Sequence, residues 1–192
     1  MNMREIILIQ ISGTDRDGLL AGIMGQLAAS GVTTLDISQS VIHDDLSLGV
    51  LIEVPRESES SPILKDLLFW AHNQGLHLKF TPVTEDDYER WVGMQGRRRH
   101  IVIVLGRTIT AANLAAMAEV ITRNGLSIDC ITRLSGRRSL ANPPAMPRSC
   151  LEFSVRGTPA DISAMRAAFL DLSREQGIDI GFQEDNAFRR IR

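Results

Sequence analysis

One order of predicted elements occurs twice in this sequence of 192 residues, and the repeat constrains the fold more than any single motif. Residues 6–82 read as strand, helix, strand, strand, helix and strand, and residues 100–182 read in the same order. A unit of this kind forms a four-stranded antiparallel sheet with both helices on one face and the other face uncovered. We therefore predict an α+β fold of two βαββαβ modules in tandem.

The first module shows the patterns most clearly. Residues 6–11 form a short apolar run rich in β-branched side chains, which predicts a buried strand. Apolar side chains at a period near 3.6 predict two helices, and those at a period of two predict further strands. The expected buried stripes of the helices are Leu20, Ile23, Met24 and Leu27, then Leu64, Leu67, Leu68 and Ala71.

The stretch between the modules has no sustained apolar period of either kind. We place the first domain at residues 1–83, the connector at 84–98 and the second domain at 99–192. Tyr88 and Trp91 indicate that the connector packs on something. In the second module, residues 140–148 include three prolines and predict a long exposed hairpin loop.

The turn between the first strand and the first helix is the candidate binding site. Gly13 and Gly18 frame it, and backbone amides at the helix start are left unpaired, where a small anionic or zwitterionic ligand can dock. Two glycines at this spacing also occur in phosphate-binding loops. However, Leu19 and Leu20 stand where such a loop needs Lys and Ser or Thr. The alternative is a purely structural turn with Asp17 as the helix cap.

Each module pairs its glycine turn with an aspartate early in the next strand. Gly13 to Asp36 spans 23 positions, and Gly106 to Asp129 spans 23 as well. We expect the two members of each pair to lie at the same end of neighbouring strands, with Asp36 as a counter-charge for an ammonium group. The second turn has no second glycine, so we expect it to supply one wall of a shared pocket rather than a full site.

The composition excludes several classes of function. A net charge of −2 and a pI of about 6.1 leave no broad basic surface, which argues against a nucleic-acid partner. Cys130 and Cys150 are too few for a disulfide framework, so reduced thiols in a cytoplasmic protein are expected. No apolar run is long enough to cross a membrane, and no signal peptide is evident. The four histidines are scattered, so we expect no metal site and no cofactor.

The first turn and its surroundings resemble the ACT domain, a ferredoxin-like βαββαβ module that binds amino acids and regulates metabolic enzymes. The motif G-x-D-x-x-G is present from Gly13 to Gly18, followed by Gly31-Val32 and by Leu35-Asp36-Ile37. From this resemblance we expect a small amino acid at an interface between modules. The ligand-binding residues it implies are Gly13, Thr14, Asp15, Gly18, Leu19 and Asp36, with Gly106 and Asp129 in the second module.

The tandem arrangement is similar to the amino-terminal regulatory region of bacterial phosphoserine phosphatases of the SerB type. The stretches that carry this similarity are Leu46–Leu51, Val104–Ala111 and Asn124–Asp129. It implies an amino-acid-sensing and dimerisation region with L-serine as the ligand. We also expect a homodimer, because each sheet has an uncovered face and edge strands that can pair with another copy. The alternatives are a purely structural dimerisation module with a vestigial ligand site, or an independent enzyme on this fold.

In that family a haloacid-dehalogenase-type domain follows the second module. It carries a D-x-D-x-[ST] motif, whose first Asp is the nucleophile, and uses Mg²⁺ as cofactor. The present sequence contains no such motif and stops at Phe188–Arg192, about where the resemblance places the strand before it. We therefore expect this chain not to be an enzyme, with Mg²⁺ needed only in a missing catalytic domain.

Overall fold

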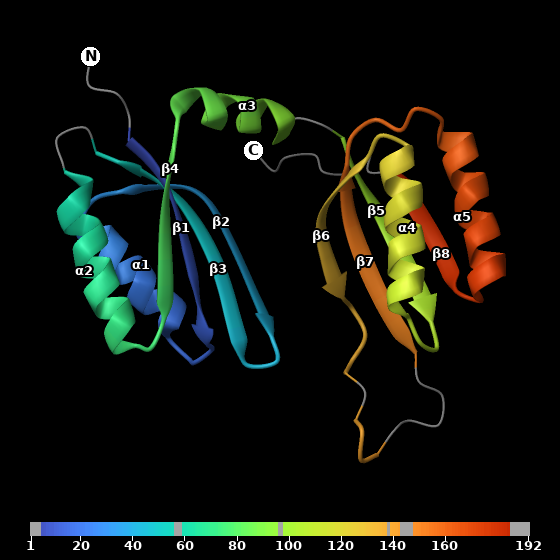
Figure 1. Ribbon diagram of the computed structural model, residues 1–192, viewed down its shortest axis with the longest axis horizontal. Coiled ribbons are helices and arrows are strands. Elements are labelled where there is room, and N and C mark those ends of the chain that lie inside the picture. Colours follow the sequence, from blue (N-terminus) through green and yellow to red (C-terminus); the bar gives the residue numbers. More distant parts are fainter. Residues whose placement is uncertain (1–4, 56–58, 96–97, 138, 143–147, 185–192) are drawn as a thin grey trace. The chain divides into compact units, whose positions relative to one another are not determined.

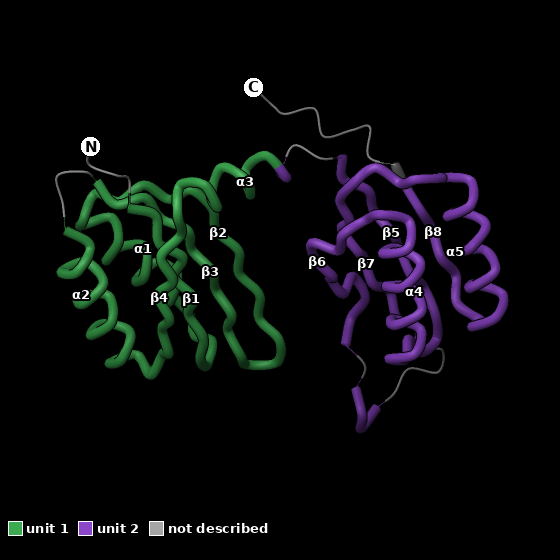
Figure 2. Tube along the Cα trace, turned by 45° about the horizontal axis from the view of Figure 1, so that its top comes forward, with its two compact units in different colours: residues 1–93 green, residues 94–192 purple. Residues whose placement is uncertain are grey.

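Both predicted modules are present, and each is a four-stranded antiparallel sheet with two helices on one face (Figure 1). The computed structural model describes residues 5–55, 59–95, 98–137, 139–142 and 148–184. The chain divides into unit 1, residues 1–93, and unit 2, residues 94–192 (Figure 2). The chain end Phe188–Arg192 and residues 143–147 of the predicted hairpin loop lie outside the described residues.

In unit 1 the strands lie in the order β2-β3-β1-β4, so β1 is paired on both sides. Ile9 of β1 aligns with Val50 of β3 and with Phe80 of β4, and all three face the helices. The elements are β1 (Glu5–Thr14), α1 (Leu19–Ala29), β2 (Thr33–Ile42), β3 (Asp45–Val54), α2 (Ser60–Asn73), β4 (His77–Val83) and α3 (Glu85–Gln95).

Unit 2 repeats the topology with the order β6-β7-β5-β8 and with β5 in the centre. Val102 of β5 aligns with Phe153 of β7 and with Phe182 of β8, beneath the two helices of this unit. The elements are β5 (Arg99–Gly106), α4 (Ala111–Arg123), β6 (Ser127–Arg133), β7 (Ser149–Arg156), α5 (Ile162–Gln176) and β8 (Asp179–Glu184).

The buried stripe of α1 differs from the predicted one at its first position. Leu19, Ile23 and Leu27 are buried, whereas Leu20 is 41% exposed. The prediction was wrong there because both Leu19 and Leu20 are apolar, so the pattern could not choose between stripes about 100° apart on the helix. The second helix shows a similar difference, since its buried residues are Ile63, Leu67 and Ala71.

The connector is a helix, which the sequence pattern did not predict. α3 has no buried residue, so it shows no apolar stripe of the usual width. Its stability comes from local contacts instead. The Asp87 amide donates to the Thr84 hydroxyl, and the acidic first turn matches the positive end of the helix dipole.

Two glycines of α1 provide a matched test of how tightly α1 packs on α2. A Cβ on Gly22 would lie 2.3 Å from Trp70 Cζ2, whereas a Cβ on Gly25 would meet nothing within 4 Å. We expect Gly25→Ala to stabilise unit 1 by about 0.5–1 kcal/mol through helix propensity. Gly22→Ala should be less stable than Gly25→Ala by about 1–3 kcal/mol, because the ring must move.

Both tryptophans of the chain, Trp70 and Trp91, lie in unit 1, so urea unfolding followed by tryptophan fluorescence reports on this unit. Equal unfolding midpoints for the two alanine variants would contradict the packing of Trp70 against Gly22.

Candidate functional site

The β1–α1 turn of unit 1 leaves the start of α1 without a side-chain cap. Gly18 is the N-cap residue, with φ of 84°, and it offers no side chain that could cap the first amides of the helix. The Leu19 amide donates to the Arg16 carbonyl at 3.4 Å. The alternative of Asp17 as the cap is therefore wrong. A Cβ on Gly18 would meet nothing within 4 Å, so the helix start is open on that side, while Leu19 is buried and anchors the turn. An open helix start attracts negatively charged groups.

Gly13 has a packing role that is independent of any ligand. It is aligned with Leu46 of β3 near the end of β1, where Thr14 is the last residue. A Cβ on Gly13 would lie 2.9 Å from Leu76 Cδ2 and 3.2 Å from the Gly75 carbonyl oxygen. The residue must be glycine because β4 begins so close to it.

Two hydrogen bonds fix the turn to neighbouring segments. The Asp15 amide donates to the Asp44 carbonyl of the β2–β3 hairpin at 2.7 Å. The Arg16 guanidinium donates to the Gln74 carbonyl at the end of α2. The turn is thereby held in one conformation before any ligand arrives, which lowers the entropy cost of binding.

The expectation that Gly13 and Asp36 lie at the same end of neighbouring strands is wrong. β3 lies between β1 and β2, and Gly13 is aligned with Leu46 whereas Asp36 is aligned with Leu51. Leu51 is in turn aligned with Leu8, five residues before Gly13. At the rise of a β-strand the two sites are about 16 Å apart along the sheet. One small ligand cannot contact both within one unit.

The corresponding helix start in unit 2 is closed by its own side chains. Thr110 and Asn113 form a reciprocal capping box at α4: the Asn113 amide donates to Thr110 Oγ1 at 3.2 Å, and the Thr110 amide donates to Asn113 Oδ1 at 2.7 Å. Asn113 Nδ2 also donates to Gln176 Oε1 at 2.5 Å. Gly106 ends β5 with Ile178 Cγ2 only 3.1 Å from where its Cβ would be.

Asp129 is neither the equivalent of Asp36 nor available to a ligand. Each module has a β-bulge in its second strand, but the extra residue is Leu35 in unit 1 and Asp129 in unit 2. The strand position of Asp36 therefore corresponds to Cys130. Asp129 Oδ1 lies 2.5 Å from Arg156 Nη2, and each side chain is only 19% exposed. The equal spacing of 23 residues concealed this offset.

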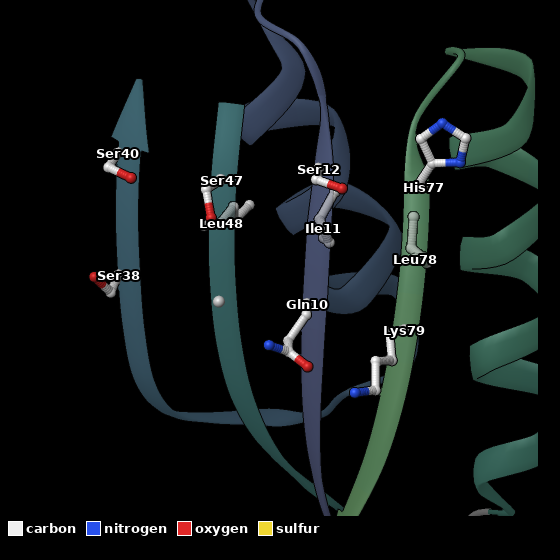
Figure 3. Close-up of a pocket in the computed structure, with 11 residues that line it drawn as sticks. Gln10, Ile11, Ser12, Ser38, Ser40, Ser47, Leu48, His77, Leu78 and Lys79 are labelled. Atoms are coloured by element: carbon white, nitrogen blue, oxygen red, sulfur yellow. The ribbon is translucent and has the colours of Figure 1, made fainter. Parts of the chain in front are cut away.

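Sequence analysis missed a polar hollow on the sheet face opposite the helices of unit 1. This polar hollow, of about 470 Å³, lies across all four strands (Figure 3). Its polar side chains are Gln10, Ser12, Ser38, Ser40, Ser47, His77 and Lys79. The signal in the sequence was Gln10 and Ser12, which alternate with buried Ile9 and Ile11 in a strand expected to be buried throughout. This part of the open face is polar, so its burial by a partner is not required.

A second hollow lies on the same face, toward the start of β1, and has a different lining. This α3 hollow, of about 330 Å³, is lined by Leu8, Asp36, Leu51, Val83, Tyr88 and Trp91. The expectation that Tyr88 and Trp91 pack on something is thus confirmed, since both are half-buried and line this hollow together with residues of the sheet.

Other chemistry is not found in the described part of the chain. No group of three or more His, Cys, Asp or Glu side chains among the described residues could hold a metal ion. No described helix is long and apolar enough to cross a membrane. Cys130 and Cys150 are free thiols.

The comparisons with known proteins agree with this fold. ACT-domain models match residues 5–81 and 98–183. The chain is 30% identical over 184 residues to a phosphoserine phosphatase of Streptomyces coelicolor, and 28% identical over 185 residues to the phosphoserine phosphatase SerB2 of Mycobacterium tuberculosis. These alignments cover 96% of this chain but only 41% and 42% of the two relatives.

A solved structure of an unknown protein from Galdieria sulphuraria has the same fold. Its TM-score is 0.69 at 16% identity, and the match covers 94% of this chain and 98% of that protein. At this identity the likeness concerns the fold alone. The two ACT-domain models, which match residues 5–81 and 98–183, show that the chain belongs to the ACT-domain family and carries two ACT domains in tandem, in agreement with its two four-stranded antiparallel sheets.

Proposed function

We propose that this chain is an amino-acid-sensing regulatory region of a phosphoserine phosphatase and that it binds L-serine at the β1–α1 turn of unit 1. The observation that carries the proposal is the open start of α1, where Gly18 supplies no side-chain cap. The similarity to two phosphoserine phosphatases supports the choice of ligand. Hydrolysis of phosphoserine yields serine, so a serine site would sense the product of the reaction.

The turn provides groups for both charges of an amino acid. The amides at the start of α1 can hold a carboxylate, helped by the helix dipole. Asp15 and Asp17 stand in the same turn and can accept hydrogen bonds from an ammonium group. Asp36 is not part of this proposal, because it is too far along the sheet. A small ligand held only by the turn is still exposed to water, so we propose that a second copy of the chain supplies the remaining wall.

Unit 2 is not proposed to hold a complete site. The Thr110–Asn113 capping box satisfies the helix start, and Arg156 neutralises Asp129. A ligand would have to displace both sets of contacts before it could bind there. We therefore propose that unit 2 has a structural role and contributes to assembly.

The alternative function is a structural dimerisation module with a vestigial site. The two turn glycines support this alternative, because the fold itself requires both of them. Gly13 avoids a clash with the start of β4, and Gly18 has a positive φ that favours glycine. The glycine motif alone is therefore not proof of ligand binding, and a direct binding measurement is needed.

L-serine should raise the melting temperature of the chain. At about 100 times its dissociation constant, a ligand that binds only the folded state adds about 2.7 kcal/mol of stability. Gly18→Val should abolish this shift, because a branched side chain would cover the open amides of α1. The shift is measured by differential scanning fluorimetry relative to the melting temperature of each variant without ligand.

Gly31→Val is the matched control, because Gly31 also has a positive φ but follows the other end of α1. It should be destabilised to a similar extent and keep the full L-serine shift. A Gly18→Val variant that stays folded and keeps an unchanged shift would place the site elsewhere. No shift with the unaltered chain would favour the structural alternative.

We propose a homodimer, supported by the open face of unit 2. Val102 and Val104 of β5 point toward the helices, so Ile101, Ile103 and Leu105 lie on the opposite face of the sheet. Light scattering should give about twice the monomer mass of 21.2 kDa. Ile103→Glu should yield monomers because it places a charge on this apolar strip.

The control for the dimer is Thr122→Glu, which adds the same charge on an exposed position of α4. It should leave the mass unchanged. A 21.2 kDa species for the unaltered chain at tens of micromolar would contradict the dimer. A dimer that survives Ile103→Glu would place the interface away from this strip.

We expect no release of phosphate from phosphoserine in the presence of Mg²⁺. The sequence has no D-x-D-x-[ST] motif to supply a nucleophile. Phosphate is measured colorimetrically, with the phosphatase of Streptomyces coelicolor as the positive control. An activity that one substitution in this chain abolishes would contradict the expectation.

A further inference from the structure

The α3 hollow has the size and lining of a small-molecule site. Its volume of about 330 Å³ lies at the lower end of the range for ligand pockets. Four of its six lining residues belong to the sheet, and Tyr88 and Trp91 come from α3. Asp36 supplies the only carboxylate of this lining, and the Tyr88 hydroxyl and the Trp91 indole N–H are the other polar side-chain groups.

The bulge in β2 directs Asp36 into this hollow. Leu35 is the extra residue, and after it Asp36 aligns with Leu51, which is only 8% exposed, on the face away from the helices. Asp36 Oδ1 accepts a hydrogen bond from the Ile37 amide at 2.9 Å. Among the described residues no cationic side chain pairs with Asp36, which leaves Oδ2 as an acceptor for an external donor.

Unit 2 shows how the same fold neutralises a carboxylate at this bulge. There Asp129 is paired with Arg156 of the adjacent strand at 2.5 Å. By strand register the position of Arg156 corresponds to Glu53 in unit 1. Unit 1 therefore has no cation at the position of Arg156, and Asp36, which is exposed and lies one residue beyond the bulge, has no equivalent of the Asp129–Arg156 ion pair.

The two rings of α3 form a wall of the hollow rather than filling it. Tyr88 and Trp91 are one turn apart, with ring centroids separated by 5.9 Å, and both stay half-buried. Aromatic faces attract cations, most strongly where water is excluded. A carboxylate and two aromatic rings around an apolar floor are a combination suited to an ammonium group on an apolar body.

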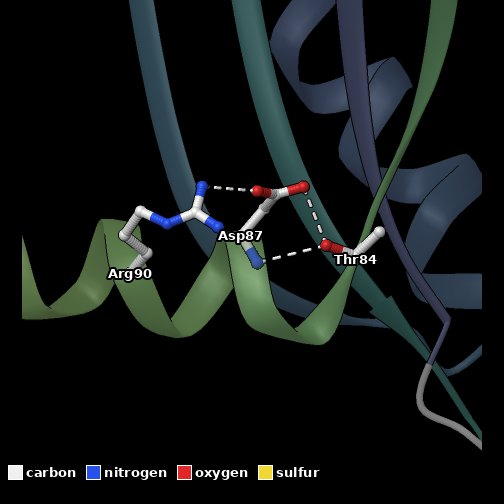
Figure 4. Close-up of polar contacts among 3 residues, drawn as sticks. All are labelled: Thr84, Asp87 and Arg90. Atoms are coloured by element: carbon white, nitrogen blue, oxygen red, sulfur yellow. Dashed lines mark hydrogen bonds and ion pairs between the residues drawn. The ribbon is translucent and has the colours of Figure 1, made fainter.

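α3 holds its own shape and does not need to close the hollow to be stable. Thr84 and Arg90 both bind the Asp87 carboxylate, as Figure 4 shows. The Thr84 hydroxyl, followed by the Arg90 guanidinium, lowers the pKa of Asp87, so this carboxylate is ionised at neutral pH. Because Asp87 is already bound by these two partners, it does not compete with Asp36 for a cation.

We propose that the α3 hollow binds an organic ammonium ion with an apolar substituent. The ammonium N–H groups donate to Asp36 Oδ2, and the substituent lies between the rings of α3 and the floor formed by Leu8 and Leu51. A free amino acid fits less well, because the lining offers no cation for its carboxylate. The site is thus separate from the proposed L-serine site in residues and in ligand chemistry.

Isothermal titration of the 192-residue chain with 2-phenylethylamine tests the proposal. We expect saturable binding, with 2-phenylethanol and L-phenylalanine each weaker by about tenfold or more, since one lacks the charge and the other adds a carboxylate. Asp36→Asn should weaken the amine by about tenfold or more while keeping the hydrogen bond to Ile37. Trp91→Ala should weaken it too, because it removes one aromatic wall.

The matched control is Asp66→Asn, which removes the same charge from an exposed position of α2. It should leave amine binding unchanged, as should Gly18→Val, so that failure of the L-serine site and failure of this site can be told apart.

Circular dichroism verifies that each variant is folded. If Asp36→Asn does not fold, the proposal is tested by amine binding to Trp91→Ala and by the relative affinities of the unaltered chain for the three ligands. Absence of saturable amine binding, equal binding of the alcohol, tighter binding of L-phenylalanine, or unchanged binding by folded Asp36→Asn would each overturn the proposal.

Discussion

The central strand of each sheet is hydrogen-bonded on both sides, and this pairing determines which of its side chains lie on the open face of the unit. In unit 1, β1 is paired with β3 and β4, so its backbone is fully committed to the sheet and only its side chains differ between the faces. Ile7, Ile9 and Ile11 are buried beneath α1 and α2. The alternate residues Leu8, Gln10 and Ser12 therefore form the centre of the open face, which is apolar toward one end and polar toward the other.

This gradient explains why unit 1 can leave half of its open face in water. The polar end carries hydroxyl, amide and amino groups that water can solvate, and α3 covers the apolar end. Unit 2 has a different distribution, because Ile103 and its neighbours along β5 place an apolar strip on the open face. Burial of that strip would release water from apolar surface, so the driving force for association is greater at unit 2 than at unit 1.

Periodicity was sufficient to predict the order of the elements, because each helix and strand of the two modules buries one face. It failed where burial does not decide the structure. α3 is held by Thr84 and its neighbours, and the choice between Leu19 and Leu20 depends on where the chain leaves Gly18. The candidate site could not be predicted from the spacing of residues in the sequence. That spacing does not reveal that β3 lies between β1 and β2, or that a bulge determines the face on which Asp36 lies.

The two units differ most in how they satisfy two kinds of polar group: the amides at the start of the first helix and the carboxylate near the β-bulge. A helix start without a side-chain cap is less stable than a capped one, whereas an exposed carboxylate such as Asp36 is solvated by water when it has no counter-charge. Unit 2 satisfies its helix start with the Thr110–Asn113 capping box, and its bulge residue Asp129 is paired with Arg156. Unit 1 retains a helix start without a side-chain cap at Gly18, and at Asp36 a carboxylate with no cationic partner among the described residues. Gly13, which precedes this turn, lies about 16 Å from Asp36 along the sheet. Because a ligand gains most where the protein has left a group unpaired, we propose recognition of small molecules at unit 1, and for unit 2 a role in the proposed dimer.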